Sequence, residues 1–424
     1  MGTSVLSDPF PRVGGTLRCG TVAAEDLAVR YGTPLYVYDL AAVRQRLKLF
    51  HDAFAGVDHL VAYSVKANGN LELLRALAGM GCGADITSGG ELFLARRAGF
   101  PGGTIVFAGV GKTVEEIGYA LDEGIYAFNV ESRPELERID EVAADRGERA
   151  RFGVRVNPDV LARTPHAYTR TGHADTKFGV PWEEAADLYR WAAERPSLDP
   201  VGIDVHIGSQ IVESEPYVQA IDRVLELVVE LRDDGIDLSY LDIGGGYGIS
   251  YDDRPGMDIA ALARDVVPRV RASGLRLLME PGRSLVGEAG ILLTRVQYVK
   301  RTAAKTFVIV DGGMSELIRP SHYGGYHDIE LAADPSDRAP EVVDVVGPIC
   351  ETGDFLALDR AIPSPRQGDL LAVRTAGAYG FAMASNYNGR RRPAEVLVDG
   401  DRVELARRRE TYEDLVGPKR RGES

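Results

Sequence analysis

A lysine directly follows an apolar run that predicts a buried strand. The run Leu60-Val61-Ala62-Tyr63-Ser64-Val65 is rich in β-favouring residues, and Lys66 comes next. Lysine is costly to bury without a partner, so its amine is either solvated at the end of a snorkelling side chain or used in chemistry. The chemistry open to it is a Schiff base with a carbonyl carbon. For a lone lysine snorkelling is the commoner case, and the rest of the chain decides between the two.

The ends of other predicted strands carry further reactive groups. The segment Asp204-Val205-His206-Ile207-Gly208-Ser209-Gln210 supplies a histidine, Gly244-Gly245-Gly246 predicts a glycine turn, and Glu280-Pro281-Gly282-Arg283 adds a carboxylate and an arginine. Asp85 ends another strand. Taken singly, each has a structural explanation, such as a core histidine, a tight loop or a helix cap. Together with Lys66 they form a set that a single cofactor could use.

Pyridoxal 5'-phosphate (PLP) is a cofactor that requires such a set. Backbone N–H groups of a glycine turn, with a helix N-terminus behind them, can bind a phosphate. A lysine can hold the aldehyde, and a buried acid such as Glu280 can keep the pyridine nitrogen protonated. The protonated ring is then an electron sink for a carbanion at the substrate Cα.

The elements that must position these groups alternate between strand and helix. Several predicted helices end in a glycine just before the next strand, at Gly99, Gly124, Gly235 and Gly274, which is typical of a left-handed helix terminus. Eight near-equal β/α units favour an α/β fold of the (β/α)8 TIM-barrel type over an open doubly wound sheet. The eight predicted strands are Leu60–Val65, Gly83–Ile86, Ile105–Ala108, Tyr126–Val130, Phe152–Val156, Gly202–Ile207, Tyr240–Ile243 and Leu275–Met279. In such a barrel the strand ends meet at the catalytic mouth.

One connection is longer than the others. The segment from Pro158 to Val180 is polar and lacks periodicity, and long loops of this kind are commonly functional. It follows the fifth predicted strand, so we expect it at the mouth of the barrel.

After residue 290 the hydrophobic period shifts towards two, which predicts a second, mostly β domain of sandwich or barrel type. The pair Asp399-Gly400 between two apolar runs is a strong hairpin signal. The strand Leu35–Tyr38 precedes the barrel and is expected to join this domain. We therefore predict a PLP-binding barrel over residues 42–288 and a β domain built from 1–41 and 289–424 that completes the active site.

The composition argues against several classes of protein. The formal net charge of the 424 residues is −14, which argues against a nucleic-acid surface. No apolar run approaches a membrane span, and the first residues do not resemble a signal peptide. Cys19, Cys82 and Cys350 lie too far apart for a disulfide framework or a metal cluster, so we expect no metal and a cytoplasmic protein.

The motifs in this order resemble those of fold-type III PLP-dependent decarboxylases, and most closely the diaminopimelate decarboxylase family. They span about residues 35 to 398. The matching segments are Tyr63–Asn68, His173–Gly179, His206–Gln210, Gly244–Gly246, Glu280–Arg283, Met314–Tyr323, Gly347–Asp354 and Gly377–Asn388.

The resemblance implies roles for individual residues. Lys66 would be the Schiff-base lysine, His206 would stack on the cofactor ring, and Cys350 would protonate Cα after CO2 leaves. The implied cofactor-binding residues are Lys66, His206, Ser209, Gly246, Glu280, Pro281, Gly282, Arg283 and Tyr379. The implied substrate-binding residues are Arg283, Arg319, Tyr323, Glu351 and Tyr379. Cys350 and Glu351 would come from a partner subunit, which implies a homodimer with active sites at the subunit interface.

From composition alone the β-domain residues have simpler explanations. Cys350 follows an apolar run and fits a buried structural thiol, and Arg319 and Tyr323 fit a surface pair. The net charge of the protein favours a functional role for Arg319. An acidic protein needs an arginine to bind a carboxylate at the distal end of its substrate.

The implied reaction is decarboxylation of meso-2,6-diaminopimelate to L-lysine and CO2, the last step of lysine biosynthesis. Three alternatives remain open. One is a decarboxylase of arginine, ornithine or a carboxylated polyamine on the same scaffold. The others are an alanine-racemase-like enzyme and a non-catalytic regulator.

Overall fold

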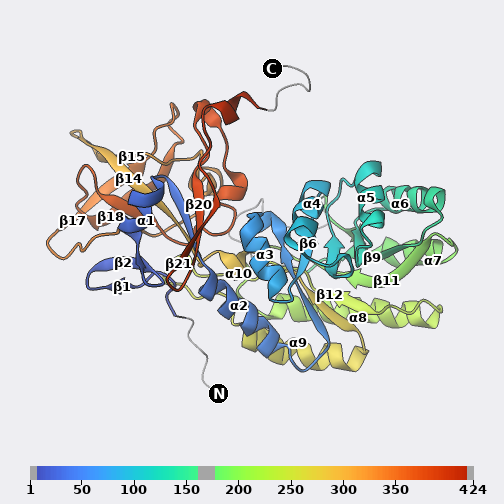
Figure 1. The fold of residues 1–424 in the computed structure, drawn as a ribbon. Helices are drawn as coiled ribbons and strands as arrows, with labels where there is room; N and C mark the ends of the chain where they lie inside the picture. The colour runs from blue at the N-terminus through green and yellow to red at the C-terminus, as the bar shows by residue number, and fades with distance from the viewer. Residues whose placement is uncertain (1–6, 161–176, 418–424) are drawn as a thin grey trace. The chain divides into compact units, whose positions relative to one another are not determined.

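The computed structural model describes residues 7–160 and 177–417 (Figure 1). Residues 173–176 of the predicted His173–Gly179 motif, and most of the long connection after the fifth strand, lie outside the described residues. The described chain forms two compact units. One comprises residues 46–249 and 255–284, apart from the undescribed segment, and the other comprises residues 7–45, 250–254 and 285–417.

The first unit is a closed parallel barrel, as predicted. Among the described residues, eight strands follow one another in chain order around the barrel, and the last pairs with the first. They are β5 (His59–Ser64), β6 (Gly83–Ile86), β7 (Ile105–Phe107), β8 (Ala127–Val130), β9 (Ala150–Asn157), β11 (Leu198–Asp204), β12 (Tyr240–Asp242) and β13 (Arg276–Met279). A short strand, β10 (Val180–Pro181), adds a parallel pair to β9.

Helices alternate with the barrel strands, as Figure 1 shows. They are α2 (Leu40–Ala53), α3 (Leu71–Gly79), α4 (Gly89–Ala98), α5 (Val114–Asp122), α6 (Arg133–Arg146), α7 (Trp182–Ala193), α8 (Glu215–Asp233) and α9 (Ile259–Ser273). Gly99, Gly124, Gly235 and Gly274 all have positive φ, so the left-handed helix ends are confirmed. Because neighbouring barrel strands are parallel, their C-terminal ends meet at one rim.

The second unit is mostly β, also as predicted. Its main sheet has the order β18-β17-β15-β14-β4-β20-β21. These strands are β18 (Phe355–Pro363), β17 (Pro340–Val346), β15 (Thr306–Val310), β14 (Gly290–Arg301), β4 (Leu35–Asp39), β20 (Ala394–Asp399) and β21 (Arg402–Arg407). Strand β19 (Leu370–Val373) pairs with β14 and with β16 (Ile329–Leu331). The N-terminal strand β4 lies between β14 and β20, and Asp399 faces Arg402 across the predicted hairpin.

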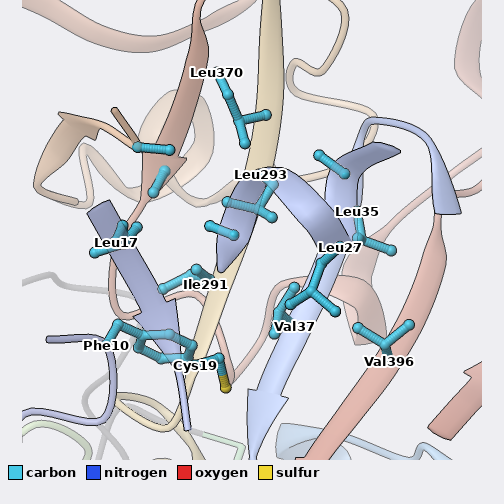
Figure 2. Packing of buried hydrophobic residues seen from close by; sticks show 14 of the residues in the cluster. Phe10, Leu17, Cys19, Leu27, Leu35, Val37, Ile291, Leu293, Leu370 and Val396 are labelled. Carbon is cyan, nitrogen blue, oxygen red and sulfur yellow. The ribbon is translucent and has the colours of Figure 1, made fainter. Parts of the chain in front are cut away.

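An apolar cluster holds the N-terminal segment onto this sheet (Figure 2). Val37 of β4 and Ile291 of β14 are both fully buried in it, together with Leu27 of α1 (Ala24–Tyr31). Burying such a side chain contributes about 1.5–3 kcal/mol. The cluster therefore explains why a strand that precedes the barrel in sequence folds with the residues that follow it.

Three short strands were not expected from the sequence. They are β1 (Arg12–Val13), β2 (Thr16–Cys19) and β3 (Val22–Ala23), which form a small antiparallel sheet. Their brevity leaves no readable alternation, so pairing with neighbours rather than local pattern decides their structure. No helix within the described ranges is long and apolar enough to cross a bilayer.

Glycine makes room for an aromatic ring inside the barrel wall. A β-carbon at Gly202 of β11 would overlap the ring of Tyr240, which is fully buried on β12. We predict that Gly202→Ala lowers the free energy of unfolding by about 1–3 kcal/mol, because overpacking forces the ring or the strand to shift.

Urea unfolding, monitored by circular dichroism, tests this prediction. Gly103→Ala is the matched control, because a β-carbon there meets no atom within 4 Å. Equal unfolding midpoints for the two variants would contradict the packing argument.

Candidate active site

Lys66 lies in a short 3-10 turn directly after β5, and its amine is paired rather than simply solvated. Its Nζ lies 2.8 Å from Oδ2 of Asp85 at the end of β6. Asp85 is fully buried, and the Ser64 hydroxyl donates to the same oxygen at 2.7 Å. The other oxygen, Oδ1, is buried without a hydrogen-bond partner among the described residues. A lysine held over a buried carboxylate is placed for chemistry, so snorkelling alone does not explain it.

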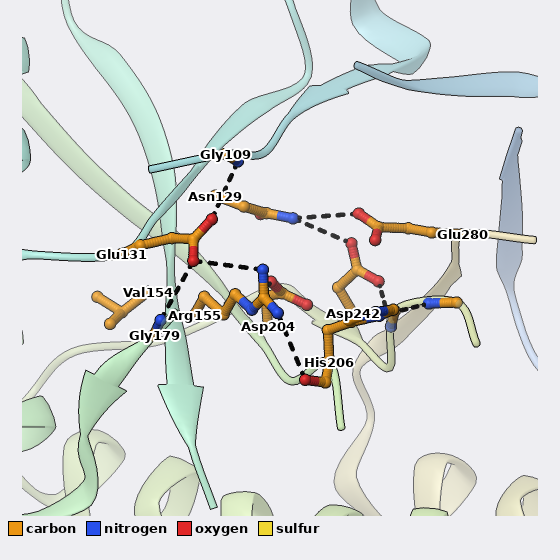
Figure 3. Close-up of polar contacts among 12 residues, drawn as sticks. Gly109, Asn129, Glu131, Val154, Arg155, Gly179, Asp204, His206, Asp242 and Glu280 are labelled. Carbon is orange, nitrogen blue, oxygen red and sulfur yellow. Dashed lines mark hydrogen bonds and ion pairs between the residues drawn. The ribbon is translucent and has the colours of Figure 1, made fainter. Parts of the chain in front are cut away.

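A buried polar network lies beside this pair (Figure 3). The Asn129 amide at the end of β8 donates to both Asp242 and Glu280, at 3.3 Å each. Asp242 also accepts from the backbone N–H of Gly244 at 2.9 Å. The network therefore links the acid expected to meet the cofactor ring with the glycine turn expected to meet its phosphate.

Burial controls the charge of these acids. Burial, and after it the neighbouring Asp242 and Asp85 carboxylates, raise the pKa of Glu280 well above its usual value. Burial, and then the Asp204 carboxylate, likewise raise the pKa of Asp242. A protonated acid at Glu280 can donate a hydrogen bond or share its proton, whereas a carboxylate there would face like charges.

His206 has a defined tautomer. Its Nδ1 accepts a hydrogen bond from the backbone N–H of Gly245 at 3.0 Å, so a neutral ring carries its proton on Nε2. Burial, and then the positive charges of Arg155 and Lys66, lower the pKa of His206 well below its usual value. The ring is thus neutral and fixed to the glycine turn.

Arg155 and Glu131 brace this side of the rim. Arg155 donates to Glu131 and to the His206 carbonyl, at 3.3 and 3.4 Å. Glu131 also accepts from the backbone N–H groups of Gly109 and Gly179, at 3.0 and 3.1 Å (Figure 3). The pair therefore ties the ends of four strands, β7, β8, β9 and β11, to the point where the long connection rejoins the barrel.

The glycine turn has the geometry that a phosphate cradle needs. Gly244 and Gly246 have φ of +66° and +91°, which glycine adopts without strain. A β-carbon at Gly246 would overlap the carbonyl oxygen of Gly208, and one at Gly245 would overlap that of Glu280. Only glycine lets the three backbone segments approach this closely.

The groups around the turn suit a phosphate. Arg283 Nη2 lies 3.4 Å from the Ser209 hydroxyl, and the Ser284 hydroxyl is buried without a partner among the described residues. A β-carbon at Gly282 would already meet Ser64 and Ala67 at 3.0 Å. With Lys66 and Glu280 nearby in the same unit, the barrel residues fit a cofactor that has an aldehyde, a ring nitrogen and a phosphate.

The remaining predicted residues lie in the second unit. Arg319 and Tyr323 are the first and last residues of α11 (Arg319–Tyr323). Arg319 is buried, with 8% of its surface exposed, so the simpler prediction of a surface pair is wrong for it. Tyr379 has a positive φ of 55° in a turn after β19, an uncommon conformation for a side chain of its size.

Cys350 is exposed, so its interpretation as a buried structural thiol is wrong. Asn388 accepts from its backbone N–H at 3.0 Å. The buried Asp354 accepts from the backbone N–H groups of Met314 and Ile349, at 2.6 Å each. The loop that carries Cys350 and Glu351 is therefore fixed at both ends, with its side chains accessible.

Sequence reasoning missed several residues of these networks. Asn129, Glu131 and Arg155 lie at or near strand ends, so the rule used for Lys66 places them at the rim but assigns them no role. Asp242 precedes the glycine turn by two residues, a spacing that itself predicts a hydrogen bond to the turn.

Comparison with known proteins agrees with this geometry. Residues 40–287 match the family described as pyridoxal-dependent decarboxylase, pyridoxal binding domain. The chain is therefore a PLP-dependent decarboxylase, and the predicted cofactor is confirmed.

Individual relatives narrow the class. Diaminopimelate decarboxylase of Aquifex aeolicus is 49% identical over 408 residues, covering 95% of this chain and 96% of the relative. That of Neisseria meningitidis serogroup A is 50% identical over 401 residues, covering 95% and 98%. The crystal structure of diaminopimelate decarboxylase from Helicobacter pylori complexed with L-lysine is 40% identical, covers 92% of this chain and 98% of its own, and has a TM-score of 0.89. The chain belongs to the diaminopimelate decarboxylase family.

The raised pKa of Glu280 gives a test of the buried acid cluster. An acid that keeps its proton only when folded makes folding less favourable as pH rises from its unfolded pKa towards its folded pKa. We predict that Glu280→Gln stabilises the cofactor-free enzyme relative to wild type, by ~1 kcal/mol or more at pH 8 and by less at pH 5.

Thermal unfolding of both proteins across this pH range measures the difference. The exposed Glu115→Gln variant is the control and should change neither the curve nor its pH dependence. Parallel pH profiles for Glu280→Gln and wild type would show that Glu280 is not held protonated by its surroundings.

Proposed function

We propose that this chain removes CO2 from meso-2,6-diaminopimelate to form L-lysine, the final step of lysine biosynthesis. The observation that carries the proposal is identity near one half with diaminopimelate decarboxylases over 95% of the chain. The geometry of the barrel residues also supports it, because Lys66, Glu280 and the glycine turn lie in the same unit. When bound, PLP supplies an electron sink for the carbanion left at the substrate Cα.

In this proposal the barrel residues bind and orient the cofactor. Lys66 would hold its aldehyde carbon, and Asp85, 2.8 Å from the lysine amine, would hold that amine when it is free. Glu280 would share a proton with the ring nitrogen, and the neutral His206 would stack on the ring. Ser209, Gly246, Pro281, Gly282, Arg283 and Tyr379 would bind the phosphate, largely through backbone N–H groups.

Residues of the second unit would bind the substrate. Arg319, Tyr323, Glu351 and Tyr379 would bind the amino-acid end that does not react, together with Arg283. Cys350 would donate the proton that Cα takes up on loss of CO2. The reaction would take place at the D-configured centre. The charged groups of the distal, L-configured end would then be recognised by these side chains. A domain division at residues 42–288 and at 1–41 with 289–424 assigns most of the cofactor binding to the first part and most of the substrate binding to the second, with Tyr379 and Arg283 as the exceptions.

The proposal also includes a homodimer, in which Cys350 and Glu351 complete the partner's site. Cys350 and Glu351 are both exposed within their own chain, which is what residues that serve another subunit require. We also infer a cytoplasmic location, because Cys19, Cys82 and Cys350 are free thiols, as in a reducing compartment.

Substrate choice is the first test. We predict CO2 release from meso-diaminopimelate, and on the order of 1000-fold lower kcat/KM with ornithine, arginine or L-lysine, because these lack one of the two charged groups at the distal end. A CO2-release assay on the PLP-loaded enzyme with each substrate measures this. Faster release from ornithine would identify a different basic amino-acid decarboxylase. Inversion at Cα without CO2 would identify a racemase, and absence of any reaction would favour a regulator.

Subunit mixing tests both the acid and the dimer. We predict that Cys350→Ala keeps PLP, seen as an absorbance band that Lys66→Ala loses, while turnover falls by about 100-fold or more. If each site takes Lys66 and Cys350 from different subunits, mixing the two inactive variants under exchange conditions should restore about one quarter of wild-type activity.

The control is each variant incubated alone under the same conditions. No recovery on mixing, with exchange verified by native mass spectrometry, would place both residues of a site in one chain. Full activity of Cys350→Ala would remove Cys350 from the reaction.

A further inference from the structure

The guanidinium of Arg319 is held by two residues that no motif singles out. Its Nη1 lies 2.6 Å from Nε2 of His327, and its Cζ lies 4.4 Å from the centre of the Tyr251 ring. His327 and Tyr251 also pack against each other, edge to face at 5.4 Å. All three residues belong to the second unit, although Tyr251 comes from the short segment 250–254 between barrel elements. Arg319 is therefore enclosed by a ring on its face and a ring nitrogen on its edge.

The contact with His327 defines a proton position. A guanidinium only donates hydrogen bonds, so Nε2 of His327 must be the acceptor. The other nitrogen, Nδ1, lies 2.8 Å from the carbonyl oxygen of Arg374 and must carry the proton, since a carbonyl only accepts. His327 is completely buried, and this pairing makes it neutral with its proton on Nδ1. The backbone at the end of β19 thereby sets which nitrogen faces Arg319.

The contact with His327 fixes the guanidinium without adding a negative charge. A carboxylate in the place of His327 would also accept from Nη1, but its negative charge would compete with an incoming anion. A neutral imidazole accepts one N–H and adds no charge of its own. Stacking on Tyr251 stabilises the cation and uses none of its five N–H donors.

Backbone packing limits the guanidinium further. The N–H of Gly325 donates to the Arg319 carbonyl at 3.1 Å, closing α11. A β-carbon at Gly325 would lie 3.4 Å from Nη2 of Arg319 and 3.2 Å from the Arg319 carbonyl oxygen. The arginine thus occupies a close-fitting position rather than a flexible one, which lowers the entropy lost on binding.

We propose that His327 and Tyr251 are positioning residues that orient Arg319 as the reader of a carboxylate at the unreacting end of the substrate. They would determine specificity for a substrate that carries such a carboxylate, without touching it themselves. This inference deepens the proposed function and rests on its assignment of Arg319.

Equilibrium binding to the PLP-loaded enzyme separates positioning from general damage. L-lysine bound as the product, with its side-chain amine at the reacting end, presents its carboxylate at the unreacting end. Cadaverine is the same diamine without that carboxylate, so the ratio of their dissociation constants reports carboxylate recognition alone. Calorimetry on wild type should show lysine binding at least tenfold tighter than cadaverine. In His327→Phe, which keeps the ring and removes the acceptor, we expect lysine affinity to fall on the order of tenfold with cadaverine affinity unchanged.

Two further variants sharpen the test. His327→Gln places an oxygen near the former Nε2 and should recover part of the lysine preference. Tyr251→Leu should lower it, whereas Tyr251→Phe keeps the aromatic face and should retain most of it. In kinetics, His327→Phe should raise KM for diaminopimelate more than it lowers kcat. His51→Phe, at a half-buried histidine of the barrel unit, is the control for the same histidine-to-phenylalanine change made in the other unit.

The outcomes distinguish this inference from the function on which it rests. If Arg319→Met abolishes the lysine preference but His327→Phe and Tyr251→Leu do not, the positioning roles are wrong and the proposed function stands. If wild type shows no preference, or Arg319→Met keeps it, the assignment of Arg319 fails and the inference fails with it. Equal losses for lysine and cadaverine in His327→Phe would indicate a purely structural role and overturn the proposal.

Discussion

Several carboxyl groups are buried together at the ends of the barrel strands, and they cannot all be ionised. Asp85, Asp204, Asp242 and Glu280 are each 4% exposed or less. Burial, and then the charge of neighbouring carboxylates, raise the pKa of Asp204 and Glu280 well above their usual values. Such a cluster is stable only if some members keep their protons and the rest face cations. The positions of Lys66 and Arg155 follow from that constraint.

The same constraint explains why the cofactor groups lie where they do. Lys66 compensates Asp85, and Arg155 lies 4.0 Å from Asp204. Arg155 also donates to the carbonyl of His206, whose ring is fixed by the glycine turn that Asp242 caps. The lysine, the ring histidine and the glycine turn are thus connected through the acids rather than placed separately. Stability is reduced by this cluster, which is expected where a site is preorganised for chemistry.

The sequence predicted the elements whose signal is local and missed those that depend on tertiary contacts. The barrel strands are short apolar runs closed by glycines, and Lys66, His206 and Glu280 stand at their ends, so both fold and cofactor residues could be found. Strand β18 carries no simple sequence signal, because its exposed and buried residues do not alternate regularly and it pairs with β17 through register shifts. Asn129 was missed because an amide is common at strand ends, and its role appears only when two acids converge on it.

The roles of His327 and Tyr251 could not be predicted from the sequence, for a different reason. Neither belongs to a motif that suggests chemistry, and they lie 76 residues apart, so only folding brings both to Arg319. Their role differs from that of the residues that contact Arg155, another buried arginine. Arg155 donates to Glu131 and lies near Asp204, so its charge is balanced inside the protein. The histidine contact of Arg319 adds no negative charge, and an arginine fixed in that way retains its attraction for an anionic substrate.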